Sequence, residues 1–396
     1  MDRREFLKIL TLFAASSLLG VSQKKTSEKI IVVGAGIIGT TIAYELSKAG
    51  AKVTLIDKKF PGAQASGNSF SWINATYPKL PYNYNLLSQL GIEAYKSLSK
   101  EVNLKIKWSG SLEWFENDNN ESDAFKKLNK LLSFEKYTPV EIIKDNEART
   151  LESNIVFSKG KKIIYSKSDG AIDTDAAISE LTNEIKKMGG NILFPCEYKS
   201  SNVSMGRLLS VNTSIGEIQA TKIIFAGGID SNSLIKKKVL KEPTPGIIMK
   251  SKPFRNTINR MIVGPGIHLH QQNDGVIYFG EQDGAPASHY NRLVNRPNSF
   301  PDIYKKQHIQ NMLNKTMNFV NDISDLEIEK ISVGWRPLPL DGLPVIGWLS
   351  GQKDSYIATM HSGISLGAIV GKLVTQEVLY GSDSRLLKDF RPARFF

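Results

Sequence analysis

The sequence predicts an α/β protein in which a Rossmann-like dinucleotide-binding domain carries a second, β-sheet domain (α+β) inserted in two segments. Three observations support this prediction. Residues 29–57 have the order strand, glycine-rich turn, helix and strand that a βαβ unit requires. Strands that run into glycine turns recur at residues 222–228 and 355–367. The intervening chain alternates strands and helices without glycine signatures, and 396 residues are enough for two domains.

The first segment carries a complete dinucleotide-binding fingerprint. Its opening strand is the β-branched run at residues 30–33, of the composition typical of a buried parallel strand. Three glycines follow in the spacing G-x-G-x-x-G: Gly34, Gly36 and Gly39. The helix after them begins near Ile37 and Ile38, and the second strand ends on Asp57, at the roughly 20-residue offset that the fingerprint expects. Together these elements predict a bound dinucleotide.

Each part of the fingerprint has a physical role. The first glycine permits a tight turn, the second lets the backbone approach a pyrophosphate, and the third lets helix and strand pack closely. Free N–H groups in the first turn of the helix bind phosphate. Asp57 can accept hydrogen bonds from a ribose diol and would repel a 2′-phosphate, although Lys58 and Lys59 lie close by. An ordinary βαβ unit without a ligand is the alternative, and this segment alone leaves the identity of the dinucleotide open.

Composition restricts the partners. The formal net charge is +12, from 51 Lys+Arg and 39 Asp+Glu, but the basic residues form no compact block interleaved with aromatics. We therefore expect a solvated basic surface and no nucleic-acid partner. The single cysteine, Cys196, excludes a disulfide within the chain and a cysteine-based metal site. The five histidines show no ligand spacing, and two of them, His268 and His270, alternate in an expected strand, so we expect no metal.

The first 22 residues resemble an export signal. Arg3 and Arg4 resemble the twin-arginine motif, and the apolar run at 9–21 is too short to span a bilayer comfortably. We expect the twin-arginine export machinery to carry the folded protein to the periplasm or beyond. Cleavage after Ser22 and retention of the segment as a membrane anchor are both open, and a plain apolar helix is the alternative. The basic charge is compatible with association with a membrane surface.

Three separated motifs resemble those of the glycine/D-amino-acid oxidase (DAO) family of FAD-dependent oxidoreductases. The segment at residues 65–69 resembles the family's A-S-G-x-N segment. The segment at 334–347 is similar to the family's G-x-R-P…D-G-x-P-x-I-G, and residues 361–363 form a similar H-S-G turn. The motifs occur in the family's order, and the resemblance covers about residues 28–385.

The resemblance implies bound FAD. In the family, the first of these motifs wraps the flavin and pyrophosphate, a strand-to-glycine turn lies beneath the pyrophosphate, and the last helix starts at the flavin pyrimidine edge. With the fingerprint, the motifs give the expected FAD-binding residues: Gly34, Gly36, Ile37, Ile38, Gly39, Asp57, Lys58, Ser66, Gly67, Asn68, Ser69, Tyr198, Ala226, Gly227, Gly334, Arg336, Ser362, Gly363, Ile364 and Ser365. Relatives that tether the flavin use a cysteine in the segment matching residues 332–336. This chain has none there, so noncovalent FAD is expected.

Two residues are expected to act on the substrate. In relatives that act on amino acids, the arginine that matches Arg336 pairs with the substrate carboxylate, and its planar fork suits bidentate recognition. A structural ion pair is the alternative. His361 either lines a face of the flavin or braces the turn.

The same reasoning sets domain boundaries. An FAD-binding domain is expected at residues 27–80, 160–235 and 330–385, and a substrate-binding domain at 81–159 and 236–329. Within the latter we expect a polar loop at 117–123 before a helix at 122–132, and a hairpin around 273–275.

The resulting expectation is an exported FAD-dependent oxidoreductase that oxidises the C–N bond of an amino acid or related amine. Hydride passes to flavin N5, the imine hydrolyses, and oxygen or a membrane quinone takes the electrons. A general base is not required if the amine binds neutral. The alternatives are a cytoplasmic FAD enzyme that oxidises an amine on a tRNA base, an NAD-dependent dehydrogenase that shares only the first motif, and a non-catalytic interaction protein.

Overall fold

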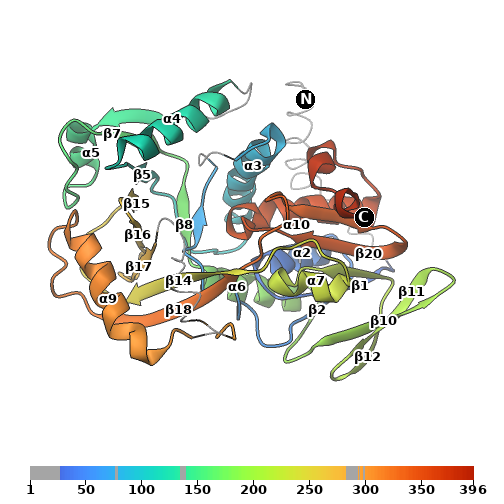
Figure 1. Ribbon diagram of the computed structural model, residues 1–396. Coiled ribbons are helices and arrows are strands. Elements are labelled where there is room, and N and C mark those ends of the chain that lie inside the picture. Colours follow the sequence, from blue (N-terminus) through green and yellow to red (C-terminus); the bar gives the residue numbers. More distant parts are fainter. Residues whose placement is uncertain (1–26, 76–78, 134–139, 282–292, 294, 298) are drawn as a thin grey trace.

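Two large sheets organise the protein (Figure 1). The computed structural model describes residues 27–75, 79–133, 140–281, 293, 295–297 and 299–396. The expected signal segment, residues 1–22, lies outside the described residues. No helix in the described ranges is long and apolar enough to cross a membrane.

The first sheet has six strands and contains the fingerprint. Its order is β19 (Val345–Leu349), β20 (Gln352–Thr359), β13 (Lys222–Phe225), β1 (Lys29–Val33), β2 (Lys52–Ile56) and β9 (Asn191–Leu193). All neighbours are parallel except β19 and β20, which form an antiparallel edge. The chain leaves the sheet after β2 and again after β13 to form strands of the second large sheet, whereas between β9 and β13 it forms a small sheet of three strands.

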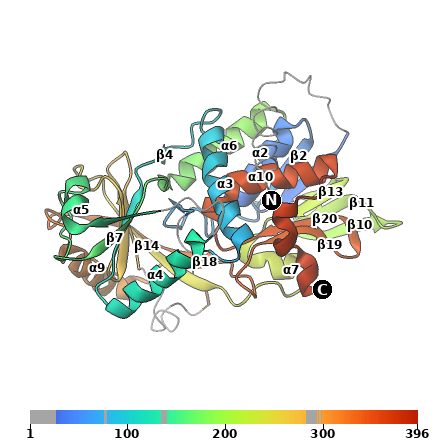
Figure 2. The ribbon, with the colours of Figure 1, turned by 90° about the horizontal axis from the view of Figure 1, so that it is seen from above.

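Strand alternation gives this sheet two different faces. Ile30 and Val32 of β1 pack in one core with a layer of helices, which are α2 (Ile37–Lys48), α3 (Tyr82–Leu98), α6 (Thr174–Lys187) and α10 (Gly363–Tyr380). Ile31 and Val33 pack in a second core, beneath the small antiparallel sheet of β10 (Tyr198–Ser204), β11 (Arg207–Thr213) and β12 (Gly216–Gln219) and the short helix α7 (Ser231–Ile235). Figure 2 shows the four helices grouped together.

The second sheet has eight mainly antiparallel strands. Its order is β18 (Ile328–Arg336), β14 (Thr244–Ser251), β17 (Ile277–Gly280), β16 (Ile267–Gln271), β15 (Met261–Gly264), β5 (Ser111–Glu113), β7 (Lys162–Ser166) and β6 (Glu141–Lys144). One face packs in a core that includes Met312 of α9 (Asp302–Met317). The helices α4 (Asp118–Leu132) and α5 (Asp145–Leu151) lie at the β6 and β7 end (Figure 1). A three-stranded sheet, β3 (Trp72–Ile73), β8 (Gly170–Ile172) and β4 (Ile106–Lys107), lies between the two large sheets.

Three elements pack or pair with the other domain than the one expected for their residues. Helix α3 packs in the helical layer of the six-stranded sheet, although residues 81–159 were assigned to the second domain. Strands β7 and β18 pair within the eight-stranded sheet, although residues 160–235 and most of β18 were assigned to the first. Each crossing is set by pairing or packing between segments far apart in the sequence, which local pattern does not encode.

The expected polar loop at 117–123 is wrong, because α4 begins at Asp118. The Asn117 side chain accepts a hydrogen bond from the backbone N–H of Asn119 and caps the helix, and acidic residues occupy its first turn. The polar residues that indicated a loop are therefore a helix start signal. The hairpin around residues 273–275 is confirmed by the antiparallel pairing of β16 and β17, with Gly275 at φ +88°.

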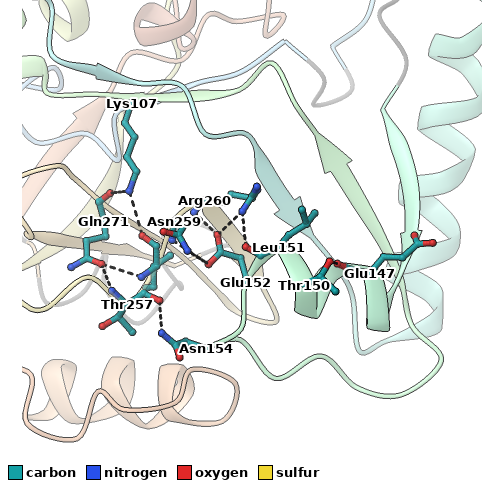
Figure 3. Close-up of polar contacts among 11 residues, drawn as sticks. Lys107, Glu147, Thr150, Leu151, Glu152, Asn154, Thr257, Asn259, Arg260 and Gln271 are labelled. Carbon is teal, nitrogen blue, oxygen red and sulfur yellow. Dashed lines mark hydrogen bonds and ion pairs between the residues drawn. The ribbon is translucent and has the colours of Figure 1, made fainter.

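A buried carboxylate fixes the segment that leads into β15 (Figure 3). Glu152 is 0% exposed and accepts hydrogen bonds from the backbone N–H groups of Asn259, at 3.1 Å, and Arg260, at 2.6 Å. The Arg260 guanidinium lies 3.4 Å from the same carboxylate. Nearby, the side-chain oxygen of Gln271 accepts from the backbone N–H of Thr257 at 2.8 Å. These contacts anchor the end of α5 to the eight-stranded sheet.

Candidate active site

One cavity of about 1470 Å³ lies between the two large sheets and is lined by residues of both. It joins the glycine-rich loop after β1, the turn after β13, the segment at 63–72, the end of β18 and the start of α10. Of the expected site residues, all line this cavity except Gly39 and Gly67. Segments that are more than 300 residues apart in the sequence therefore meet at one site, in the arrangement that the motifs predict.

Gly39 and Gly67 have packing roles next to the cavity. A Cβ atom on Gly39 would lie 1.8 Å from the carbonyl oxygen of Gly34, so only glycine lets α2 approach the loop. Gly34 has φ +103°, and a Cβ there would lie 2.5 Å from the carbonyl oxygen of Ala226. A Cβ on Gly67 would lie 2.6 Å from the carbonyl oxygen of Gly62. These glycines permit close backbone contacts that shape the cavity wall.

Two helices begin at the cavity without a side-chain cap. Helix α2 starts after Gly36 and α10 after Ser362, and neither has an acidic residue in its first turn. The first N–H groups of a helix have no partner within the helix and carry a partial positive charge. The Ser66 hydroxyl accepts a hydrogen bond from the Ile37 N–H at 3.0 Å, at the start of α2. One cavity thus has two places suited to negative charge.

The end of β2 supplies an acid whose orientation is fixed. The Asp57 carboxylate accepts hydrogen bonds from the backbone N–H groups of Ala35 and Lys59, each at 2.8 Å. Lys58 is drawn away from it, because its ammonium lies 2.7 Å from the carboxylate of Asp230. The Lys58 charge is therefore already balanced, which agrees with the expectation of a ribose diol rather than a 2′-phosphate. Tyr198, the expected adenine neighbour, lines the same end of the cavity.

The segment that resembles A-S-G-x-N bridges the two sheets. The Asn68 side-chain amide donates to the carbonyl oxygen of Gln64 at 2.8 Å, which closes the turn. A Cβ on Gly334 of β18 would lie 2.6 Å from the carbonyl oxygen of Asn68, so the two motif segments touch. Ser69 bonds back to the carbonyl oxygen of Ser66 at 3.0 Å. The side chains of Asn68 and Ser69 therefore bond to backbone carbonyl groups and fix the shape of this segment.

Arg336 and His361 line the cavity from the end of β18 and from the turn between β20 and α10. Arg336 ends β18, where it donates a hydrogen bond to the carbonyl oxygen of Pro245 at 3.1 Å. His361 keeps an exposed side chain because it faces the open cavity. The walls of the cavity still desolvate the imidazolium, and this desolvation, together with the positive charges of Arg336 and Lys79, lowers the pKa of His361 to about 4. His361 is therefore neutral near pH 7.

The two alternating histidines share one face of β16, as their spacing predicts. The Phe70 ring lies 4.0 Å from the His268 ring and 4.8 Å from the His270 ring, centroid to centroid. His268 lines the cavity, whereas His270 lies behind it and bonds the carbonyl oxygen of Phe70 at 2.9 Å. Burial lowers the pKa of both imidazoles to about 3. No group of three or more His, Cys, Asp or Glu side chains in the described ranges could hold a metal ion.

Lys79 and Glu113 are among the ionisable residues of the cavity that were not predicted. Lys79 donates to the carbonyl oxygen of Asn74 at 3.0 Å, and burial lowers the pKa of its ammonium to about 8. Glu113 of β5 also lines the cavity, and burial together with Asp169 raises the pKa of its carboxyl to about 7. No sequence signal singles out Lys79 among 51 basic residues. For Glu113, a signal exists in the alternation of polar Ser111 and Glu113 around buried Leu112.

The residues present fit FAD. The glycine loop with the uncapped start of α2 suits a pyrophosphate, and Asp57 suits a ribose. A second uncapped helix, α10, begins beside α2 in the same cavity, since a Cβ on Gly363 would lie 3.4 Å from Ile38, and its start suits a ring system that becomes negatively charged when reduced. The cavity volume exceeds the range of roughly 300–1,000 Å³ for ordinary ligand pockets, which leaves room for a second ligand beside a dinucleotide.

Comparison with known proteins identifies the family. Residues 29–377 match the DAO family, described as FAD dependent oxidoreductase. The bifunctional protein ThiO/ThiG of Trichormus variabilis is 23% identical over 385 residues, which are 92% of this chain and 55% of that protein. This chain spans about half the length of the two ThiO/ThiG relatives it matches. The glycine oxidase of Pseudomonas aeruginosa is 22% identical over 346 residues, which are 85% of this chain and 90% of that protein.

The fold is also that of a solved structure. L-proline dehydrogenase from P. horikoshii superposes with a TM-score of 0.80 at 24% identity, covering 93% of this chain and 97% of that chain. The comparisons confirm the resemblance, the α/β fold and the FAD cofactor. Because the family match extends far beyond the first motif, an NAD-dependent dehydrogenase that shares only this motif is wrong.

Proposed function

The chain belongs to the DAO family of FAD-dependent oxidoreductases, and we propose that it oxidises the C–N bond of an amino acid or a related amine. The observation that carries this proposal is that a single cavity joins the glycine-rich cofactor loop to Arg336 and His361. The names of two relatives, a glycine oxidase and an L-proline dehydrogenase, agree with amino acids as the substrate class.

The cofactor would be held without a covalent bond. The start of α2 and the Ser66 hydroxyl would bind the pyrophosphate, Asp57 the ribose of the adenosine, and the start of α10 the pyrimidine edge. When bound, FAD supplies an acceptor at N5 for the hydride of the C–H bond next to the amine nitrogen. The substrate loses two electrons and becomes an imine, and water then converts the imine to a carbonyl compound and a free amine or ammonia.

Arg336 would bind the substrate carboxylate through both guanidinium nitrogens and thereby orient the C–H bond. The amine must be neutral when its C–H bond is broken. His361, with its pKa near 4, adds no positive charge next to it at neutral pH. Lys79, with its pKa near 8, is mostly protonated at neutral pH, and its positive charge in the same cavity favours release of the proton of the substrate ammonium to water. The residues of the chain therefore position the substrate and favour its neutral form.

Anaerobic reduction of the purified yellow protein tests this function. Bleaching of the flavin absorbance would be followed with D- and L-amino acids, glycine, sarcosine and other secondary amines. We expect at least one amino acid to bleach the flavin fully and the corresponding simple amine without a carboxylate to bleach it much more slowly. A protein that is colourless and refuses added FAD, or that no amine reduces, would contradict the proposal.

Export is a second part of the proposal, which rests on the Arg3-Arg4 motif of the sequence. An exported enzyme can pass electrons to oxygen or to a membrane quinone. Changing both Arg3 and Arg4 to Lys should retain the protein in the cytoplasm, as measured by cell fractionation. Export of that variant would contradict the proposal. A reporter fused after Lys25 that stays cytoplasmic would instead favour the alternative, oxidation of an amine on a tRNA base.

A further inference from the structure

Glu113 is a charged residue of the cavity wall that the proposed reaction does not use. The preceding residue, Leu112, is 0% exposed in the core of the eight-stranded sheet, so strand alternation turns Ser111 and Glu113 toward the cavity. Within the described ranges, the Glu113 carboxylate makes no hydrogen bond and no ion pair. A largely buried carboxylate without a partner is unfavourable, so a ligand group that pairs with the Glu113 carboxylate would be bound favourably there.

Strand pairing places Glu113 on the same row of the sheet as His268. One row of paired residues crosses five neighbouring strands, and each of its members lines the cavity: Ile248, Gly280, His268, Val263 and Glu113. Neighbouring strands lie about 4.8 Å apart, so Glu113 lies roughly 10 Å from His268 on the same face. A Cβ on Gly280 would lie 2.2 Å from the His268 ring nitrogen, so the imidazole covers Gly280. The part of the row that remains for a ligand is therefore on the other side of His268, at Val263 and Glu113.

A second carboxyl group lies close to Glu113. Asp169 is 0% exposed, and its carboxylate accepts hydrogen bonds from the Ser111 hydroxyl, at 2.8 Å, and from the Trp72 indole, at 3.0 Å. Burial and the charge of Asp169 both raise the pKa of Glu113. A cation bound at Glu113 would offset both effects, whereas a bound anion would add to them.

Glu113 and Arg336 place opposite charges on separate parts of the cavity wall. Near Glu113 the wall also contains Glu116, Asp123 and Lys127, and Asp123 pairs with Lys126 at 3.5 Å. Arg336 lines the wall at the end of β18. These two groups, Glu113 and Arg336, suit a ligand that has both a carboxylate and a cation.

We propose that Glu113 is a specificity-determining residue that binds a basic group at the end of the substrate side chain, so that the preferred substrate is a basic amino acid. This inference rests on the proposed function, because it assigns the carboxylate of the same substrate to Arg336. The apolar Val263 lies between His268 and Glu113 in the row and would contact the methylene groups of the side chain.

Matched substrate pairs test the inference. Anaerobic flavin reduction would be measured by rapid mixing with lysine and norleucine, and with ornithine and norvaline, as both enantiomers. We expect the basic member of a pair to reduce the flavin at least tenfold more efficiently. Glu113→Gln should lower this advantage tenfold or more and leave the rate with the neutral member within twofold. Glu141→Gln is the control, since it removes a charge from exposed β6, outside the cavity.

A binding measurement gives a second readout that needs no turnover. The compound 6-aminohexanoate has a carboxylate and a distal ammonium but no amine next to the carboxylate, and hexanoate lacks the ammonium. We expect 6-aminohexanoate to perturb the flavin spectrum of the wild-type holoenzyme at least tenfold more tightly than hexanoate, and Glu113→Asp, which keeps the charge, to retain part of the difference. Equal affinities, or equal rates within the substrate pairs, would overturn the inference. Failure of every amine to reduce the flavin would instead overturn the proposed function.

Discussion

The hydroxyl oxygen of Ser66 lies 3.0 Å from the backbone nitrogen of Ile37 and accepts its hydrogen bond, across a sequence separation of 29 residues. A Cβ atom built on Gly36 would lie 3.0 Å from the same oxygen. The first turn of α2 is therefore enclosed on one side by the segment that resembles A-S-G-x-N and open on the other to the cavity. This contact joins the glycine fingerprint to the segment that resembles A-S-G-x-N at one wall of the cavity.

Gly36→Val should abolish retention of FAD. Gly36 has φ −74°, which any residue adopts, so the variant should fold, and its side chain would obstruct the approach to the pyrophosphate. We expect the affinity for FAD to fall at least 100-fold, about 2.8 kcal/mol, measured by flavin titration of the apoprotein. Gly36→Ala is the graded comparison, because one methyl group obstructs the pyrophosphate less than the valine side chain, so its affinity for FAD should lie between those of the wild type and Gly36→Val. An unchanged affinity in Gly36→Val would contradict this reason.

Arg336→Ala should raise KM for a carboxylate substrate about 100-fold or more, because a charge-assisted bidentate contact is lost. Flavin content should stay normal. The matched control is the same comparison with a simple amine that lacks the carboxylate, for which wild type and variant should differ by less than threefold. Arg336→Lys should recover only part of the loss, since an ammonium cannot reproduce the planar fork. An unchanged KM would remove Arg336 from the substrate site.

Features set by neighbouring residues could be predicted from the sequence, whereas features set by contacts between distant segments could not. The fingerprint at residues 29–57 is predictable because its strand, glycines and acid are neighbours in the chain, and the structure brings Gly36 and Asp57 to one cavity as expected. Lys79 and Glu113 reach the same cavity through contacts with segments distant in the sequence. In the sequence, a sheet face that lines a cavity, such as the one that carries Glu113, cannot be told from a face exposed to solvent, because polar and apolar residues alternate in both cases.

Glu152→Ala should destabilise the eight-stranded sheet strongly. The substitution leaves the partly buried backbone N–H groups of Asn259 and Arg260 and the Arg260 guanidinium without their shared acceptor (Figure 3). Breaking a buried charged pair costs about 3–5 kcal/mol, so we expect a clear fall in the urea midpoint of unfolding. Glu147→Ala is the control, since among the described residues the Glu147 carboxylate accepts one hydrogen bond, from the N–H of exposed Lys144 at 3.2 Å, and its loss should cost about 1 kcal/mol. Equal losses in the two variants would contradict the role of Glu152.

The free energy of unfolding should fall as the pH is lowered below 6.5, and His270 should contribute to this fall. Its pKa is about 3 in the folded protein, because burial disfavours the imidazolium, whereas an unfolded histidine has a pKa of about 6.5. Within the described ranges its Nδ1 has no hydrogen-bond partner, so a proton there would lack an acceptor. Between these two values the unfolded state binds a proton that the folded state does not, and stability is lost as the pH falls.

By this relation the titration of His270 lowers the free energy of unfolding by roughly 2 kcal/mol at pH 5. The effect vanishes above about pH 7.5, where the imidazole is neutral in both the folded and the unfolded state. His270→Gln keeps an amide that can donate to the Phe70 carbonyl but cannot titrate. The variant should therefore show a shallower dependence of the unfolding free energy on pH between 4 and 6.5 than the wild type, as measured by urea unfolding of the apoprotein. Above pH 7.5 the difference between the two proteins should be constant. Parallel curves across the whole range would show that His270 titrates normally in the folded state.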